Sequence, residues 1–135
     1  MVYIERRITI VNIKKPRSQS LNEELQCVGS SLGLFNLRDK NSSCFRIFIE
    51  LLKSAKTENP LSSDDLALHL NLSRGTVMHH INKLMEAGIV IHQGNQYLLR
   101  VHQLQSLIDE LQKDLQRTLD DLKSAAKEID DMMGL

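Results

Sequence analysis

Apolar residues recur at intervals of three and four along most of the chain, which predicts a mainly helical protein. The spacing predicts a short helix that begins at Ser20 and stops at Gly33. It predicts a second helix that Ser42 or Ser43 caps and whose apolar stripe extends to Ala55. A polar stretch joins the two helices and is expected to be a loop.

Two further helices follow, with a tight turn between them. Ser62 or Ser63 is placed to cap the first of these helices, and Ser73 to cap the second. Asn71 tolerates the left-handed backbone that such a turn needs, and Gly88 ends the second helix. The pair therefore has the form of a helix-turn-helix.

Short apolar runs at 89–91 and 97–99 predict two strands joined by a hairpin tip. The order helix, helix, turn, helix, hairpin is that of a winged helix-turn-helix. Residues 2–13 are dense in β-branched side chains and predict an N-terminal strand. We expect that strand to pair, with the hairpin or across a dimer; an arm that becomes ordered only on DNA is the alternative.

From 101 to 133 the helical pattern has no breaker, and apolar residues alternate spacings of four and three as in a coiled-coil seam. Such a long helix outruns so small a domain, so we expect it to form a homodimer, packing partly on its own domain and partly on a partner. Packing within one chain is the alternative. The expected interface residues are Leu104, Leu107, Ile108, Leu111, Leu115, Leu119, Leu122 and Ile129.

The predicted fold class is mainly α with a small β-hairpin wing, an N-terminal strand and a long C-terminal helix. Four segments follow from the pattern: a basic strand or arm (1–19), a short helix with a linker (20–41), a winged helix-turn-helix (42–100) and a dimerisation helix (101–135).

The stretch from Leu72 to Val90, LSRGTVMHHINKLMEAGIV, resembles the recognition helix and the start of the wing in ArsR-type winged-helix regulators, especially archaeal ones. The likeness covers about residues 43–100. It departs from the pattern at Asn71, where helix-turn-helix proteins often have Gly. The resemblance implies a regulator of transcription that binds DNA.

A major groove admits one α-helix, whose first residues reach the base edges. Arg74 suits a guanine or a phosphate, Gly75 allows close approach of the backbone, and Thr76 suits a phosphate. His80 lies near the boundary of the outward face and is also a candidate for the edge of the core. The full set of expected DNA contacts comes from the helix (Ser73, Arg74, Gly75, Thr76, His79, His80, Lys83), the wing (Gln93, Asn95, Gln96) and the N-terminal segment (Arg6, Arg7, Lys14, Lys15, Arg17).

We therefore expect a cytoplasmic homodimer that binds double-stranded DNA as a sequence-specific repressor. Arg74 and Lys83 are few charges for one DNA site, since phosphate neutralisation supplies much of the affinity. Two alternatives stay open: a low-specificity architectural DNA-binding protein, and a winged-helix adaptor that binds protein.

The composition argues against several other classes of function. Aromatic residues make up 4% of the 135 residues, which argues against stacking platforms for single-stranded nucleic acid. No apolar run is long enough for a membrane span or a signal peptide. The net charge of zero divides into +4 over residues 1–100 and −4 over 101–135.

Catalytic and metal sites find little support. There is no Gly-rich phosphate loop, nucleophile elbow or paired-carboxylate cleft, so we expect no enzyme, no cofactor and no inferable small-molecule effector. Cys27 and Cys44 stand alone, and His79 and His80 point about 100° apart on one helix, which is poor metal-ligand spacing. A helix start favours a lowered pKa for the Cys44 thiol, although packing is the role we favour.

Overall fold

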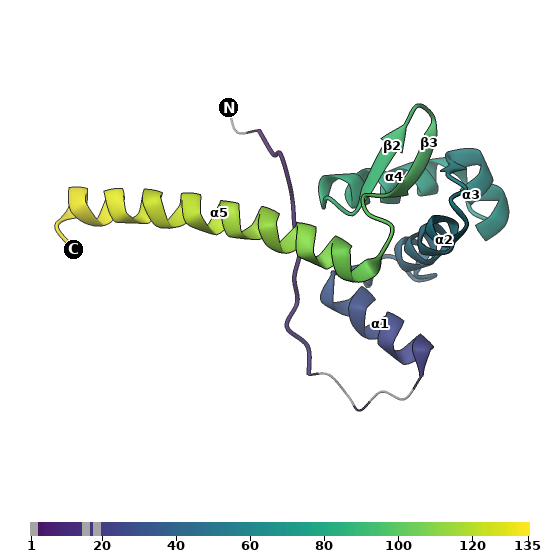
Figure 1. The fold of residues 1–135 in the computed structure, drawn as a ribbon, viewed down its shortest axis with the longest axis horizontal. Helices are drawn as coiled ribbons and strands as arrows, with labels where there is room; N and C mark the ends of the chain where they lie inside the picture. The colour runs from purple at the N-terminus through teal and green to yellow at the C-terminus, as the bar shows by residue number, and fades with distance from the viewer. Residues whose placement is uncertain (1–2, 15–16, 18–19) are drawn as a thin grey trace.

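The computed structural model describes residues 3–14, 17 and 20–135, which form helices and one small sheet (Figure 1). The elements in chain order are α1 (Leu21–Ser31), α2 (Ser43–Thr57), β1 (Leu61–Ser62), α3 (Ser63–Leu70), α4 (Arg74–Glu86), β2 (Val90–Gln93), β3 (Gln96–Leu99) and α5 (Leu104–Met133). This is the mainly α fold with a β-hairpin wing that the sequence predicts.

Polar caps fix the helix-turn-helix as expected. The Ser62 hydroxyl accepts the backbone N–H of Asp65 at 3.0 Å, and the Asp65 carboxylate accepts the N–H of Ser62 at 3.0 Å. Asn71 ends α3 with φ of 54°, in the left-handed region. Ser73 caps α4 by accepting the N–H of Thr76. These caps satisfy donors that a helix start leaves free and hold α3 and α4 at a fixed turn.

The start of α2 differs from the prediction. Ser42 has φ of 52°, and its side chain makes no capping hydrogen bond. The Asp39 carboxylate instead accepts the backbone N–H groups of Ser43 and Cys44, each at 2.9 Å. Burial opposes the charge on Asp39, yet the two N–H groups and nearby His80 keep its pKa below the usual value. The loop before α2 is thereby tied to the helix that follows it.

The hydrophobic core lies among α2, α3, α4 and the sheet. Ile47 and Phe48 of α2 belong to one cluster with Val77 and Ile81 of α4, and all four side chains are fully buried. The further buried residues of the same cluster are Leu32, Leu34, Leu51, Leu61, Leu66, Leu70, Leu84, Ile89, Val90, Leu99, Leu107 and Leu111. Because this core also includes Leu32 and Leu34, after α1, and Leu107 and Leu111 of α5, three of the predicted segments (20–41, 42–100 and 101–135) share one set of packed side chains.

The wing has one strand more than the sequence predicts. β2 and β3 form the expected antiparallel hairpin, with Gln93 opposite Gln96, and β1 adds itself to β3 with Leu61 opposite Tyr97. Gly94 has φ of +62° at the first position of the two-residue turn, where glycine carries no steric penalty. β1 has two residues, too few for a periodic pattern to reveal.

The N-terminal strand is a wrong prediction for the described residues. Residues 3–14 cross α5 without joining a sheet (Figure 1). The Arg7 N–H donates to the Glu86 carbonyl at 2.9 Å, and the Val11 N–H to the Ser31 carbonyl at 2.7 Å. Those carbonyls lie at the ends of α4 and α1, where helices leave acceptors unpaired. Val2 and Lys15 lie outside the described residues.

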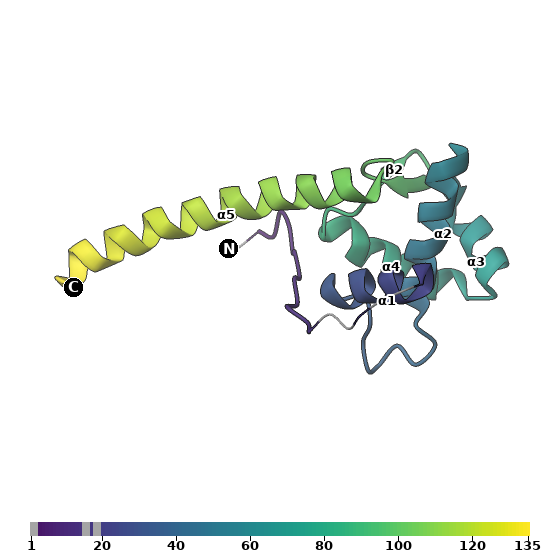
Figure 2. The same cartoon turned by 60° about the horizontal axis from the view of Figure 1, so that its bottom comes forward.

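The first turns of α5 pack on the domain, and the rest projects away from it (Figures 1 and 2). Leu107 is 0% exposed and Leu111 is 3% exposed, whereas every residue from 116 onward is exposed. The helix has 30 residues, a length of about 45 Å at the standard rise. A large part of this amphipathic helix is therefore exposed and projects beyond the described domain.

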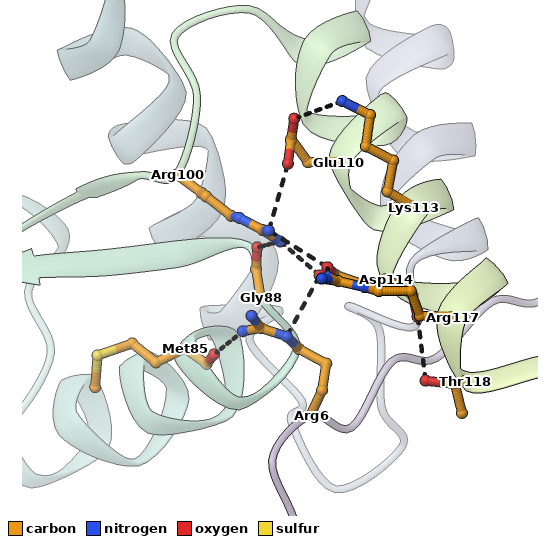
Figure 3. Close-up of polar contacts among 9 residues, drawn as sticks. All are labelled: Arg6, Met85, Gly88, Arg100, Glu110, Lys113, Asp114, Arg117 and Thr118. Atoms are coloured by element: carbon orange, nitrogen blue, oxygen red, sulfur yellow. Dashed lines mark hydrogen bonds and ion pairs between the residues drawn. The ribbon is translucent and has the colours of Figure 1, made fainter. Parts of the chain in front are cut away.

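A cluster of arginines around Asp114 fixes the direction of α5 (Figure 3). Arg100, directly after β3, donates to the Asp114 carboxylate at 2.6 Å, and Arg6 approaches the same carboxylate at 3.4 Å. Arg100 also reaches the Gly88 carbonyl and Arg6 the Met85 carbonyl, both at 3.5 Å. The hydrogen bond from Arg100 keeps the pKa of Asp114 below its usual value. The cluster thus joins α5, the wing and the end of α4.

Candidate nucleic-acid interface

The outer face of α4 carries most of the predicted contact residues. Ser73, Arg74, Gly75, His79 and Lys83 are exposed. Gly75, His79 and Lys83 follow one another at intervals of four and share one side of α4, while Val77 and Ile81 hold another side in the core. Ser73 and Arg74 lie at the exposed start of the helix. The helix is therefore anchored along its length and presents a continuous polar surface.

Hydrogen bonds hold the first turn of α4, and the space outside Gly75 is open. The Ser73 hydroxyl donates to Thr76 Oγ1 at 2.8 Å while accepting the Thr76 N–H at 3.1 Å, and Thr76 is half-buried. A Cβ added at Gly75 would meet nothing within 4 Å. The start of a helix presents free N–H groups and a partial positive charge, which suit a phosphate.

Arg74 is exposed but not entirely free. Its Nε lies 3.7 Å from a carboxylate oxygen of Asp64 at the start of α3, and both side chains are largely in solvent. An exposed pair of this kind is weak, so a phosphate or a guanine can replace the carboxylate at small cost.

His80 lies inside the domain. It is 8% exposed, and among the described residues its Nδ1 has no hydrogen-bond partner. Its Nε2 is 3.8 Å from the Asp39 carboxylate. Burial lowers the pKa of His80, which opposes protonation at neutral pH. This burial agrees with the alternative assignment to the core edge, so we leave His80 out of the interface.

The wing tip presents amides rather than charges. Gln93, Asn95 and Gln96 are all exposed, and residues 90–99 include no Lys or Arg. The Tyr97 hydroxyl donates to the Met78 sulfur at 3.6 Å and ties the wing to one side of α4. The wing can hydrogen-bond to DNA but cannot neutralise phosphates.

Some of the basic N-terminal residues form ion pairs within the protein, and others are exposed. Arg6 and Arg7 are engaged within the protein, Arg6 with Asp114 and Arg7 with Glu86 at 2.8 Å. Lys14 and Arg17 are exposed, and Lys15 is outside the described residues. Sequence reasoning missed the role of the two arginines because Asp114 and Glu86 are distant in the chain.

The predicted dimer residues fall into two groups along α5. Leu107 and Leu111 are buried in the core of their own domain, and Leu104 packs against it. Ile108, Leu119, Leu122 and Ile129 are 40%, 42%, 60% and 53% exposed, with Leu115 half-buried. The second group is thus free to meet another surface.

The structure also brings forward residues that the sequence analysis did not single out. Residues 36–41 belong to the connection between α1 and α2 and lie beside α4; we call them the 36–41 loop. A groove between this loop and α4 is lined by Arg38, Lys40 and Lys83 among others. A run of polar residues between two helices gives no signal of where the loop folds back. Only the tertiary arrangement shows it.

Cys44, which lines the same groove, differs from the expectation. Burial and the nearby Asp39 charge raise the pKa of its thiol to about 11, so the helix start does not activate it. Among the described residues, no group of three or more His, Cys, Asp or Glu side chains is placed to hold a metal ion. The prediction of no metal site stays a prediction.

Comparison with known proteins agrees with this geometry. Residues 49–92, from the middle of α2 into β2, match the model of the bacterial regulatory protein arsR family. No curated protein matches the chain. In the described part of the chain, no helix is long and apolar enough to cross a membrane. The likeness to ArsR-type regulators is confirmed over residues 49–92, which form an ArsR-type helix-turn-helix domain, a domain of DNA-binding transcription regulators. The likeness to archaeal members stays a prediction.

Proposed function

We propose that this protein is a homodimeric repressor that reads a near-palindromic DNA sequence and occludes a promoter. The two copies of α4 would enter successive major grooves about 34 Å apart. The observation that carries this proposal is the exposed apolar stripe of α5 in a chain whose α4 presents a DNA-binding face. In this proposal the protein acts in the cytoplasm and does no chemistry.

The reading of bases rests on the start of α4. Arg74 and His79 are exposed. Arg74 lies at the very start of α4, the part of a recognition helix that reaches the base edges, and His79 lies one turn further along. Arg pairs with guanine through two hydrogen bonds, and such a contact gives about 1–3 kcal/mol of discrimination. Wing residues Gln93, Asn95 and Gln96 would add contacts to the sugar-phosphate backbone or the minor groove.

The dimer rests on the free half of α5. Ile108, Leu115, Leu122 and Ile129 follow one another at intervals of seven, and Leu119 lies beside them. Such a repeat is the seam of a coiled coil, in which a second helix covers the apolar residues. Without a partner, only local helix propensity would hold the last turns of this amphipathic helix. A helix held in that way is marginally stable in water. A second copy of α5 supplies the missing surface.

The double variant Leu119→Glu/Leu122→Glu tests the proposal. Both side chains lie outside the core, so the domain should still fold, while two buried charges in the seam should separate the dimer. We expect light scattering to give a dimer for the wild type and a monomer for the double variant. Duplex affinity should fall by about a hundredfold or more, because the two half-sites would no longer be linked.

Ser124→Glu is the matched control, since it adds a charge to the exposed part of the same helix away from the seam. The control should remain a dimer. A double variant that stays dimeric with full duplex affinity would place the interface elsewhere. A wild type that is monomeric yet binds duplex tightly would remove the dimer from the proposal.

A further inference from the structure

A groove beside the recognition helix has the chemistry of a phosphate site. It lies between the 36–41 loop and α4, with a volume of about 520 Å³. Its lining includes Asn36, Arg38, Lys40, Thr76, His79 and Lys83. Three of the six are fixed cations, and the others are polar groups able to hydrogen-bond to an anion.

The cations in the groove are available. Arg38, Lys40 and Lys83 are exposed, and within the described part of the chain no ion pair engages any of them. Asp39 also lines the groove, but its carboxylate faces the N–H groups at the start of α2. The acid is therefore satisfied inside the protein, and the cations dominate the surface that a ligand would meet.

The loop is held in shape before any ligand arrives. The Asn36 side chain accepts the backbone N–H of Arg38 at 2.9 Å, and its carbonyl accepts that of Asp39 at 2.9 Å. Ser42 donates its N–H to the Asp39 carbonyl at 3.1 Å. These bonds close two tight turns around the residues that carry the charge, so little ordering entropy would be lost on binding.

The position of the groove matches one side of a DNA major groove. Figure 2 shows the 36–41 loop and the β2–β3 hairpin on opposite sides of α4. A helix in the major groove has a phosphate backbone on each side. The wing has no Lys or Arg, and Arg74 forms an ion pair with Asp64. Among the described residues, the 36–41 loop thus places unpaired positive charge beside α4.

We propose that this groove binds phosphate and that its occupant is the DNA backbone on the side of α4 opposite the wing. Arg38 and Lys40 from the loop and Lys83 from α4 neutralise the phosphates, with Asn36 and Thr76 as neutral donors. The inference rests on the proposed function, because it assumes that α4 enters the major groove. It adds a second, sequence-independent contact element to each copy.

The test compares Arg38→Ala/Lys40→Ala with Lys123→Ala/Lys127→Ala, which removes the same charge from the projecting part of α5. Both pairs are exposed, so thermal unfolding should match the wild type. Duplex affinity is measured over a range of salt concentrations. The loop variant should bind about tenfold or more weakly at low salt, and its salt slope should fall by about 0.9 for each phosphate that the variant no longer neutralises.

The loss should be equal for a selected duplex and for a scrambled one, because phosphates carry no sequence information. The α5 control should keep the wild-type slope. If the wild type binds duplex and the loop variant matches it in affinity and slope, the loop inference is overturned while the proposed function stands. If the wild type binds no duplex, the proposed function fails and the DNA occupant fails with it.

Inorganic phosphate distinguishes a duplex from a small anion. It is titrated against the wild type without DNA, with chloride holding the ionic strength constant. Weak, unsaturated binding together with the loss of duplex affinity supports the DNA backbone. Saturable phosphate binding that the loop variant loses, with duplex affinity unchanged, would assign the groove to a free anion and contradict the proposal.

Discussion

Gly75 lies at the start of α4, where the packing of the protein itself does not require glycine. A Cβ there would meet nothing within 4 Å, and the residue has helical rather than left-handed backbone. Glycine in a helix costs about 1 kcal/mol relative to alanine. The absence of a side chain at this exposed place is consistent with close approach of a partner's surface.

The Gly75→Ala variant should therefore change stability and binding in opposite directions. We expect the free energy of unfolding to rise by about 0.5–1 kcal/mol, because alanine loses less backbone entropy on folding. Duplex affinity should fall, because the new methyl group would stand between the helix and the DNA. Chemical denaturation and fluorescence anisotropy measure the two effects. A variant with higher stability and unchanged affinity would show that α4 does not approach DNA at this residue.

His80 gives the protein a defined dependence on pH. Because burial lowers its pKa from 6.5, the folded protein keeps it neutral where the unfolded chain already binds a proton. Its contribution to stability is thus complete above pH 6.5 and is lost as the pH falls through the lower, folded-state value. Asp39, the acid that faces it, has a pKa below its usual 3.8.

We expect His80→Gln to lose less stability than the wild type between pH 7.5 and pH 5, since glutamine has no charge to gain. Urea unfolding at the two pH values measures the difference, and the exposed histidines cancel because both proteins have them. An equal loss in both proteins would mean that His80 titrates normally.

At the residue scale the sequence predicts what local chemistry decides. Ser62, Asn71 and Ser73 act as their positions indicate, because a cap depends on residues close in the chain. The inward position of His80 and the pairing of Arg6 depend on which distant elements pack against them. A pattern of polar residues cannot supply that information.

Asp114 is the anchor at the scale of elements. It is 5% exposed, and Arg100, Arg6 and Arg117 all approach its carboxylate. Through them α5 is joined to the strand end of the wing and to the N-terminal segment (Figure 3). This cluster ties the start of α5 to the domain, so in the proposed dimer it would set the separation of the two α4 helices.

Asp114→Asn should lower the free energy of unfolding by about 1.5–3 kcal/mol at neutral pH, the usual range for hydrogen bonds to a charged group. The loss should shrink as the pH falls below 3.8, because the unfolded wild-type chain then binds a proton while the folded carboxylate, with its lower pKa, still resists one. Denaturation curves at pH 7 and pH 3 compare the two. Asp109→Asn, at an exposed residue of the same helix, is the control and should cost little.

The elements themselves were predictable to different degrees. α2, α3, α4 and α5 follow the apolar spacing because each buries one face. The N-terminal segment has the composition of a strand, yet residues 3–14 bond to helix ends. β-branched residues favour extended backbone but do not choose its partner. β1 escaped notice because two residues carry no period.

For the whole molecule, the two halves of α5 have different surroundings although their apolar residues look alike in the sequence. Leu107 and Leu111 complete the core of their own domain, whereas Leu119, Leu122 and Ile129 are left in solvent. The seam could be predicted, but not how far the domain covers it. The groove beside α4 likewise arises from the way α1 and α2 place their connecting loop.

A dimer of this chain that reads DNA through two copies of α4 requires a target with two-fold symmetry. The deciding experiment is selection from a random duplex pool at near-physiological salt, with the recovered sequences tested for symmetry. We expect an enriched near-palindrome whose half-sites lie about one helical turn apart. Retention without enrichment that vanishes as salt rises would contradict sequence-specific binding in favour of an architectural protein. No retention of any duplex would contradict DNA binding itself and point to a protein partner.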